Sequence, residues 1–198
     1  MKKIVVICAL MISGICSFGQ SSEVKNMLKE IDGQWSLDDN GNVTYQRIVE
    51  VPEMKKDDIY NRVLMYFVYN YGSGKSVIQT QDKENGQIIG KGLYENLQTF
   101  SNGFGWVNLS TWHIARVDVK DGKARIILTL TEYSENFKGS ISSHNVKEDF
   151  PINKDGTGKG NRGKAFYNSH IRAIATLNAI EKAIKEGNTS KSIENKEW

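Results

Sequence analysis

The sequence predicts an α+β fold, in which an antiparallel sheet carries two helices packed on one of its faces. Several segments place apolar residues at alternate positions, which is the period of a half-buried strand. Asn85-Gly86 and Asp121-Gly122 separate neighbouring strand-like segments, and both dipeptides favour tight hairpin turns. Two further segments have a helical period. The predicted order is one strand, a helix, four strands and a helix, and neighbouring strands pair as hairpins.

The first strand and the first helix are predicted on either side of a proline. Residues 43–51 alternate in character, and Pro52 ends the strand because proline cannot donate to a ladder. Residues 55–71 change to a helical period, with Asp57 and Asp58 in the first turn, where carboxylates favour the positive end of the helix dipole. The apolar positions of this helix are Ile59, Val63, Tyr66 and Phe67.

The four strands that follow form two predicted hairpins. Residues 76–82 and 86–97 flank the Asn-Gly turn, and residues 106–119 and 123–135 flank the Asp-Gly turn. The segment 136–160 is rich in Ser, Asn, Gly and Lys, which predicts a long loop.

The last predicted element is a helix over residues 162–186. Its apolar residues recur at spacings of three and four, so they form a stripe that we expect to bury against the sheet. The stripe consists of Phe166, His170, Ala173, Leu177, Ile180 and Ile184. Gly187 follows as a candidate C-cap.

The two ends of the chain are predicted to lie outside this domain. Residues 1–19 combine two lysines, an apolar core and small residues before the expected cleavage site, which is typical of a secretory signal peptide. Residues 20–40 are predicted to be a short helix or a loosely packed lead-in, residues 41–187 a single domain, and residues 188–198 a polar tail. Lipidation at Cys16 is a rival fate, although Ile15 stands where lipoprotein processing requires a small residue.

Export is a testable prediction. We expect the mature protein to begin at or near Gln20, after cleavage behind Gly19, and to reach the periplasm or the medium. N-terminal sequencing of the purified protein checks this expectation. An intact Met1 or a lipidated Cys16 would contradict it.

Composition narrows the functions that remain. Both cysteines, Cys8 and Cys16, lie in the signal peptide, so the mature chain has no disulfide, thiol nucleophile or cysteine metal ligand. Removing Lys2 and Lys3 lowers the formal charge from +3 to +1, which gives no general attraction to nucleic acid. No other segment is long and apolar enough to span a membrane.

Two glycine-rich stretches resemble phosphate-binding loops. Gly74-Lys75-Ser76 has Tyr69 where the first glycine belongs, and it lies between a predicted helix and a strand, which is the reverse of the required order. Residues 158–164 have the correct spacing, but Ala165 replaces the hydroxyl that holds magnesium. We therefore predict no nucleotide and no other cofactor. Lys159, Arg162 and Lys164 are left as a possible anion-binding group near a helix N-terminus.

Other side chains give no catalytic pattern. His113, His144 and His170 fall on a strand, a loop and a helix without metal-ligand spacing, and the paired carboxylates are expected to be solvated. We therefore predict that the protein is not an enzyme. Aromatic residues gather around one pair of strands, where core packing explains most of them. Those that share an exposed face would form a surface for a partner or a sugar, and the candidates are Tyr94, Phe104, Trp106 and Trp112.

Part of the sequence resembles a known family. The segments YQRIVEVP, KKDDIYNRVLMYF, VIQTQDKENGQIIGKG and RVDVKDGKARI are similar to a family of exported bacterial proteins of unknown function, whose fold is similar to that of the TATA-box-binding protein (TBP). The resemblance covers roughly Val43 to Tyr133, and the DKENGQIIGKG hairpin is its most specific part. It implies a TBP-like fold and export, but no activity, because fold does not determine function.

Three functions remain open at this point. The first is a non-enzymatic binding module of the cell envelope, which contacts an unknown protein or envelope ligand through the sheet face opposite the helices. The second is a small-molecule carrier, with its ligand between the sheet and the last helix. The third is an envelope hydrolase, which the sequence favours least. An exposed aromatic patch, an internal cavity or converging titratable groups would distinguish them. The oligomeric state is not predicted.

Overall fold

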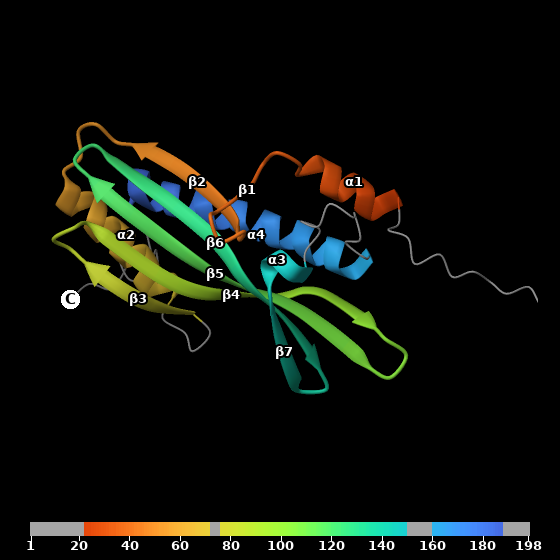
Figure 1. Cartoon of the computed structure of the whole chain (residues 1–198). Coiled ribbons are helices and arrows are strands. Elements are labelled where there is room, and N and C mark those ends of the chain that lie inside the picture. Colours follow the sequence, from red (N-terminus) through yellow and green to blue (C-terminus); the bar gives the residue numbers. More distant parts are fainter. Residues whose placement is uncertain (1–21, 72–75, 150–159, 188–198) are drawn as a thin grey trace, which may run out of the picture.

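The computed structural model describes residues 22–71, 76–149 and 160–187. Its elements in chain order are α1 (Ser22–Glu30), β1 (Ser36–Leu37), β2 (Val43–Glu50), α2 (Lys56–Asn70), β3 (Ser76–Asp82), β4 (Gln87–Ser101), β5 (Trp106–Lys120), β6 (Lys123–Phe137), β7 (Ser140–Asn145), α3 (Val146–Asp149) and α4 (Gly160–Glu186). Figure 1 shows the arrangement. The predicted strand, helix, four strands and helix correspond to β2, α2, β3 to β6 and α4, so the predicted α+β class is confirmed.

All described strands form one antiparallel sheet. Its order is β1-β2-β6-β5-β4-β3, and β7 pairs with β6 beyond the end of β2. The two predicted hairpins, β3–β4 and β5–β6, are both present. In the second, Lys120 pairs with Lys123 across a two-residue turn, and Gly122 has a φ of 74° that suits this tight connection.

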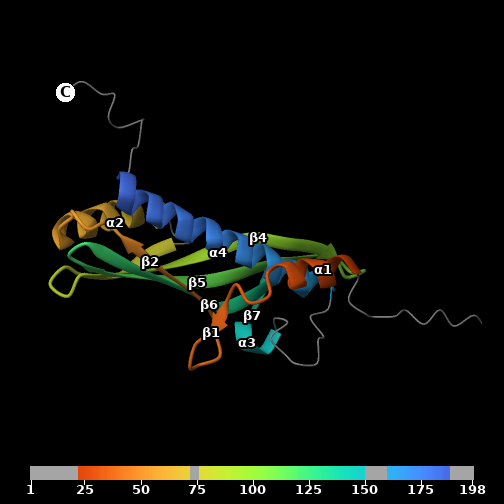
Figure 2. The same ribbon diagram turned by 90° about the horizontal axis from the view of Figure 1, so that it is seen from above.

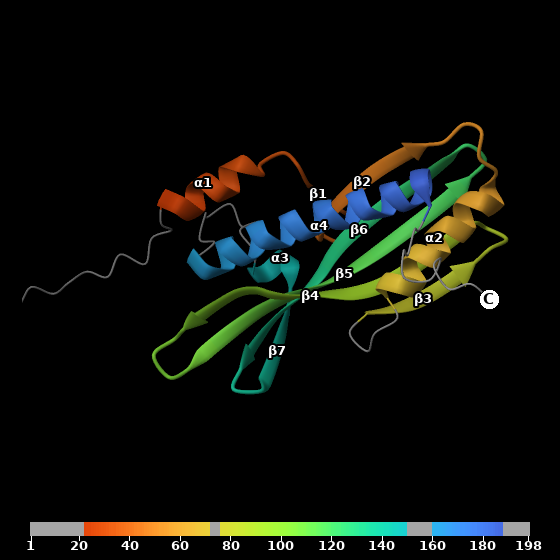
Figure 3. The ribbon, with the colours of Figure 1, turned by 180° about the vertical axis from the view of Figure 1, so that it is seen from behind.

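The helices α2 and α4 lie on the same face of the sheet, as Figures 2 and 3 show. One continuous core fills the space between these helices and the strands. Gly90 on β4 lets α2 approach closely, because a Cβ atom there would lie 2.5 Å from the ring of Phe67. The predicted packing of both helices on one face is therefore confirmed.

The long helix α4 closes the core. The predicted stripe of Phe166, Ala173, Leu177, Ile180 and Ile184 is buried along its whole length. The end of α4 is also fixed, because Arg62 of α2 donates hydrogen bonds of 2.8 Å to the carbonyls of Ile184 and Lys185. Gly187 has a φ of 81°, and its amide bonds to the carbonyl of Ala183. It is the predicted C-cap.

The predicted long loop over residues 136–160 is wrong for its first part, which contains β7 and α3. The chain reverses after β6 at Lys138 and Gly139, which both have positive φ, and the side chain of Asn136 accepts a hydrogen bond from the Gly139 amide. Strand β7 then pairs through its backbone, which requires no apolar side chains. Because the sequence of β7 is almost entirely polar, it has no alternation of apolar residues from which a strand could be predicted.

In the N-terminal region the structure has the short helix α1, the first of the two alternatives predicted for residues 20–40. Helix α1 packs near α4 and buries Val24, and Ile31 behind it also lies in the core. Lys164 of α4 forms an ion pair of 2.9 Å with Glu23 of α1. The predicted signal peptide over residues 1–19 and the predicted tail over residues 188–198 lie outside the described residues.

At the end of the molecule where α1 also lies, two hairpins project past α2 and α4 (Figures 1 and 3). They are the β4–β5 hairpin and the β6–β7 hairpin. A register shift in β4 between Tyr94 and Gln98 marks where the first of them leaves the main sheet. Helix α2 lies at the opposite end.

Candidate functional site

The face of the sheet turned away from α2 and α4 is the candidate site, and we call it the outer face. Because side chains alternate along a strand, one residue of every two on β2, β6, β5 and β4 belongs to it. Its apolar members include Ile48, which is 50% exposed, and the partly exposed Trp112, Ile114 and Ile127. Neither of the two long helices covers them (Figure 2).

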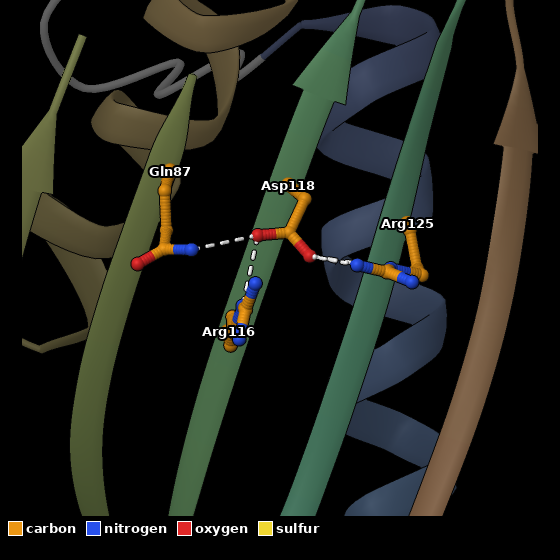
Figure 4. Close-up of polar contacts among 4 residues, drawn as sticks. All are labelled: Gln87, Arg116, Asp118 and Arg125. Carbon is orange, nitrogen blue, oxygen red and sulfur yellow. Dashed lines mark hydrogen bonds and ion pairs between the residues drawn. The ribbon is translucent and has the colours of Figure 1, made fainter. Parts of the chain in front are cut away.

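One row of residues crosses four strands of this face. Ile48 on β2 is the register partner of Arg125 on β6, which pairs with Asp118 on β5, which pairs with Gln87 on β4. Figure 4 shows how three of these residues and Arg116 converge. Register alone therefore brings a carboxylate and two guanidinium groups together.

Asp118 is the centre of this group. Its Oδ1 atom accepts hydrogen bonds from Gln87 Nε2 at 3.0 Å and Arg116 Nε at 2.8 Å, and its Oδ2 atom accepts one from Arg125 Nη2 at 2.7 Å. Partial burial by itself raises the pKa of Asp118, but these three donors together outweigh it and hold the pKa below its usual range. Asp118 is thus a carboxylate that its neighbours neutralise, and not a general base poised near neutral pH.

A pocket of about 280 Å³ lies beside this group, at the β5–β6 turn. Its lining residues are Ile48, Asp118, Lys120, Lys123, Ala124 and Arg125. Three of them are cationic and one is anionic, and the Asp118 carboxylate already accepts bonds from two arginines. The pocket therefore favours an anionic or acidic group over a cation.

A second polar group lies farther along the outer face. Lys91 of β4 forms an ion pair of 3.5 Å with Glu132 of β6, and its Nζ atom lies 4.9 Å from the centre of the Trp112 ring. Lys91 of β4 therefore contacts both the indole of Trp112 on β5 and the carboxylate of Glu132 on β6. The outer face thus combines ion pairs with a partly exposed tryptophan, and tryptophan is enriched at protein contact surfaces.

The opposite side of the sheet buries a histidine. His113 of β5 accepts or donates a hydrogen bond of 2.8 Å between its Nε2 atom and the Tyr71 hydroxyl, and Tyr94 stacks on its ring at 3.9 Å. Gly92 makes room for it, because a Cβ atom there would lie 2.7 Å from His113 Cε1. Burial lowers the pKa of His113 to about 3, so the ring is neutral at physiological pH.

A second buried histidine lies between β2 and α4. The rings of His170 and Tyr45 are 5.5 Å apart, and the Tyr45 hydroxyl and the His170 Nδ1 atom have no hydrogen-bond partner among the described residues. Burial lowers the pKa of His170 below its usual value, although Glu30 opposes this shift. Both histidines are 4% exposed or less, which shields them from any substrate in solution.

The predicted anion-binding residues have carboxylate neighbours. Arg162 donates a bond of 3.1 Å to Glu135, and Lys164 pairs with Glu23. Lys159 lies outside the described residues. Neither glycine-rich stretch is described in full, because residues 72–75 and 150–159 are not. The anion site therefore stays a prediction.

The four predicted surface aromatics do not lie together. Phe104 and Trp106 lie at the tip of the β4–β5 hairpin, whereas Trp112 lies six residues farther along β5, about 20 Å away at strand geometry. Tyr94 faces the helices instead, where its hydroxyl bonds to Thr176 of α4 at 2.7 Å. Only Trp112 therefore belongs to the central part of the outer face.

Residues 22–71, 76–149 and 160–187 contain no group of three or more His, Cys, Asp or Glu side chains that could hold a metal ion. None of the helices in these ranges combines the length and the apolar composition that a membrane span requires.

Comparison with known proteins confirms the predicted resemblance. Residues 45–134 match the model of a family described as a domain of unknown function (DUF4468) with TBP-like fold. A DUF4468 family protein from Bacteroides ovatus is similar in structure, with a TM-score of 0.59 and 18% identity over 80% of this chain and 94% of that chain. A TBP-like protein from Parabacteroides distasonis has a TM-score of 0.56 and 18% identity, over 76% of this chain and 97% of that one. No curated protein matches the sequence.

Proposed function

Starting from a DUF4468 domain of TBP-like fold, which residues 45–134 carry, we propose that this chain is a non-enzymatic binding module of the cell envelope. The outer face is its contact surface for a protein partner. The observation that carries this proposal is that α2 and α4 leave this face uncovered, although it contains Ile48, Trp112, Ile114 and Ile127. Partly exposed apolar residues that share one open face of a sheet are typical of interaction sites.

The charges of the outer face indicate the chemistry of the partner. Around the β5–β6 turn, the cations Arg116, Lys120, Lys123 and Arg125 outnumber the carboxylates of Asp118 and of Glu50, the register partner of Lys123. A partner with acidic side chains around an apolar centre would complement this surface. Such complementarity raises association rates and selects the partner.

The titratable groups of the described residues support a binding role over catalysis. On the outer face, Asp118 and Glu132 both take part in ion pairs. Two of the three histidines, His113 and His170, are buried on the other side, and the third, His144, lies on β7, away from the polar group around Asp118. A catalytic group has to reach its substrate within hydrogen-bond distance, and the two buried rings cannot.

A carrier function is the second candidate, and one observation favours it. The unpartnered Tyr45 hydroxyl and His170 Nδ1 atom lie between the sheet and α4, where the carrier would hold its ligand. A small polar ligand, or a water, could bond to both atoms. Val43 on β2 and Phe166 and Ala173 on α4, which flank Tyr45 and His170 along their elements, are fully buried, so a ligand larger than a water would require α4 to move.

Capture from envelope extracts tests the binding proposal. We expect the variant Ile48→Glu to retain its fold, because the side chain is half exposed and lies beside Lys123 and Arg125. For a defined set of proteins, the amount that the variant captures should be at least tenfold lower than the amount that the wild type captures. The reason is that the substitution removes an apolar contact and reduces the basic charge of the surface. Mass spectrometry of cross-linked material identifies the set, and one purified member is then measured by direct titration.

The matched control is Val68→Glu, which makes the same kind of change on α2, at a half-exposed position of the helical side. This variant should capture the full set. If the outer-face variant captures the same proteins as the wild type, or if Val68→Glu loses them, the outer face is not the contact surface.

A further inference from the structure

The tip of the β4–β5 hairpin presents two large side chains to solvent. Phe104 is 83% exposed and Trp106 is 69% exposed. The loop that holds them is well ordered by hydrogen bonds, because Asn102 Oδ1 accepts from the amides of Phe104 at 3.0 Å and Gly105 at 3.1 Å. The amide of Asn102 also bonds to the carbonyl of Gly105. The loop thus keeps two aromatic side chains exposed to solvent. Contact with an apolar partner would bury them and would be favourable.

A second hairpin tip lies beside the first. It is the β6–β7 turn, in which Lys138 and Gly139 have positive φ and Ile141, on β7, is 67% exposed. The two tips touch, since a Cβ atom on Gly105 would lie 2.9 Å from Lys138 Cε. Figures 1 and 3 show both tips at the end of the molecule that lies away from α2.

Charge is distributed unevenly at this end. The segment Leu97–Ser110, which includes the whole first tip, contains no charged residue. The second tip contributes the cation Lys138, whose Nζ atom lies 5.3 Å from the centre of the Phe137 ring. The carboxylate that precedes it in β6, Glu135, is paired with Arg162. The two tips themselves therefore combine exposed aromatic and aliphatic side chains with one positive charge, that of Lys138.

We propose that these two hairpin tips, which we call the paired tips, dock the protein onto the surface of an anionic lipid bilayer. The paired tips form a projection and not a groove, so they suit insertion into a deformable surface. Trp and Phe side chains are favoured at the boundary between headgroups and acyl chains. Lys138 lies beside the loop that carries Phe104 and Trp106. If these two side chains entered the bilayer, its ammonium group would lie near the lipid phosphates, which would complement its charge.

The position of Lys138 agrees with this role. Its φ of 51° is a left-handed conformation, in which lysine is less favourable than asparagine or glycine. A hairpin turn selected for stability alone would use one of those two residues. The lysine supplies a charge that neither can supply.

Vesicle binding by the full-length mature protein tests the proposal. The probes are vesicles of phosphatidylcholine alone and of phosphatidylcholine with a quarter phosphatidylglycerol, and the readout is the fraction of protein that sediments with lipid. The double variant Phe104→Ala/Trp106→Ala should bind the anionic vesicles at least tenfold more weakly than the wild type, because it loses most of the apolar surface of the first tip. The control Met65→Ala/Val68→Ala removes two exposed apolar side chains of α2, at the opposite end, and should bind as the wild type does.

The charge is tested separately. Lys138→Asn keeps a residue that tolerates the left-handed turn, so the fold should be retained and any loss of binding reports the charge. We expect about fivefold weaker binding to the anionic vesicles and no change on the neutral ones. Added salt should reduce the difference between wild type and this variant.

A fluorescence measurement places the tip in the bilayer. Lipids brominated on the acyl chain should quench part of the tryptophan emission of the wild type, and this part should disappear in Trp106→Phe, which keeps an aromatic side chain. The proposal is wrong if the wild type does not bind either vesicle, if the double variant binds as well as the wild type, or if quenching survives in Trp106→Phe. A dimer in sedimentation analysis that the double variant abolishes, without vesicle binding, would assign the paired tips to self-association instead.

Discussion

Replacing Leu177 with alanine is expected to lower the free energy of unfolding by about 2–5 kcal/mol, because it leaves a cavity between α4 and the sheet. The Leu177 side chain is 2% exposed and lies in the single core that α4 shares with the strands. A domain of this size has a total stability of about 5–15 kcal/mol, so the loss is a large fraction of it. Denaturant titration, followed by circular dichroism, measures the change as a shift of the midpoint at constant slope.

The control for this prediction is Lys182→Ala in the same helix. The Lys182 side chain is 71% exposed, and its ion pair with Glu186 spans 3.8 Å, so we expect a change within about 0.5 kcal/mol. Equal midpoints for wild type and Leu177→Ala would show that α4 is not a structural part of the domain. The surface that α4 covers would then become a candidate contact site.

Acidification is expected to destabilise the protein before its carboxylates titrate. His113 has a pKa of about 3 in the folded protein and about 6.5 in the unfolded chain. Between these values the unfolded chain binds one more proton than the folded protein. The stability that neutral His113 contributes is therefore complete above pH 6.5 and decreases as the pH falls towards 3. From pH 6.5 to pH 4.5 the loss amounts to about 2.3 kcal/mol, because the unfolded histidine is already half protonated at pH 6.5.

The variant His113→Gln isolates this effect. Glutamine can still bond to the Tyr71 hydroxyl, but it does not titrate. The pH dependence of unfolding between pH 6 and pH 4 should thus become shallower by about one proton, or about 1.3 kcal/mol per pH unit. His170, whose pKa is also lowered by burial, accounts for dependence that remains in the variant. Identical slopes for wild type and His113→Gln would refute the assignment of the proton to His113.

The sequence predicted the framework of this fold because its strongest signals are local. The Asp121-Gly122 turn set the β5–β6 hairpin, and the stripe on α4 set the helix that covers it. Strand β7 escaped prediction because its pairing is made by the backbone and its side chains are polar. The sequence indicated helix α1 only weakly. Its apolar residues Val24 and Ile31 are buried through long-range packing, including contacts of α1 with α4, which no local signal reveals.

Prediction of the candidate site was less complete, for a similar reason. A two-residue turn at Asp121-Gly122 dictates that Asp118 faces Arg125, so this half of the polar group was available in the sequence. Gln87 joins it only through the β4–β5 register, which no local signal specifies. Tyr94 was expected on the exposed side, whereas it stacks on His113. It lies before the register shift in β4 and in step with the buried Ile88, so alternation from the Asn-Gly turn already places it on the helical side.

The pairing of β2 with β6 has a consequence for the order in which the chain folds. The Thr44 and Thr129 hydroxyls that meet across this pair are 85 positions apart. Ribosomes add about 5–20 residues per second, so the newly made β2 segment waits on the order of 4–17 seconds for its neighbour to be synthesised. During that time its apolar residues Val43, Tyr45 and Val49 have no sheet to cover them. Strands β3 to β6, whose partners are adjacent, assemble without this delay, and a holding chaperone would act on the β2 segment.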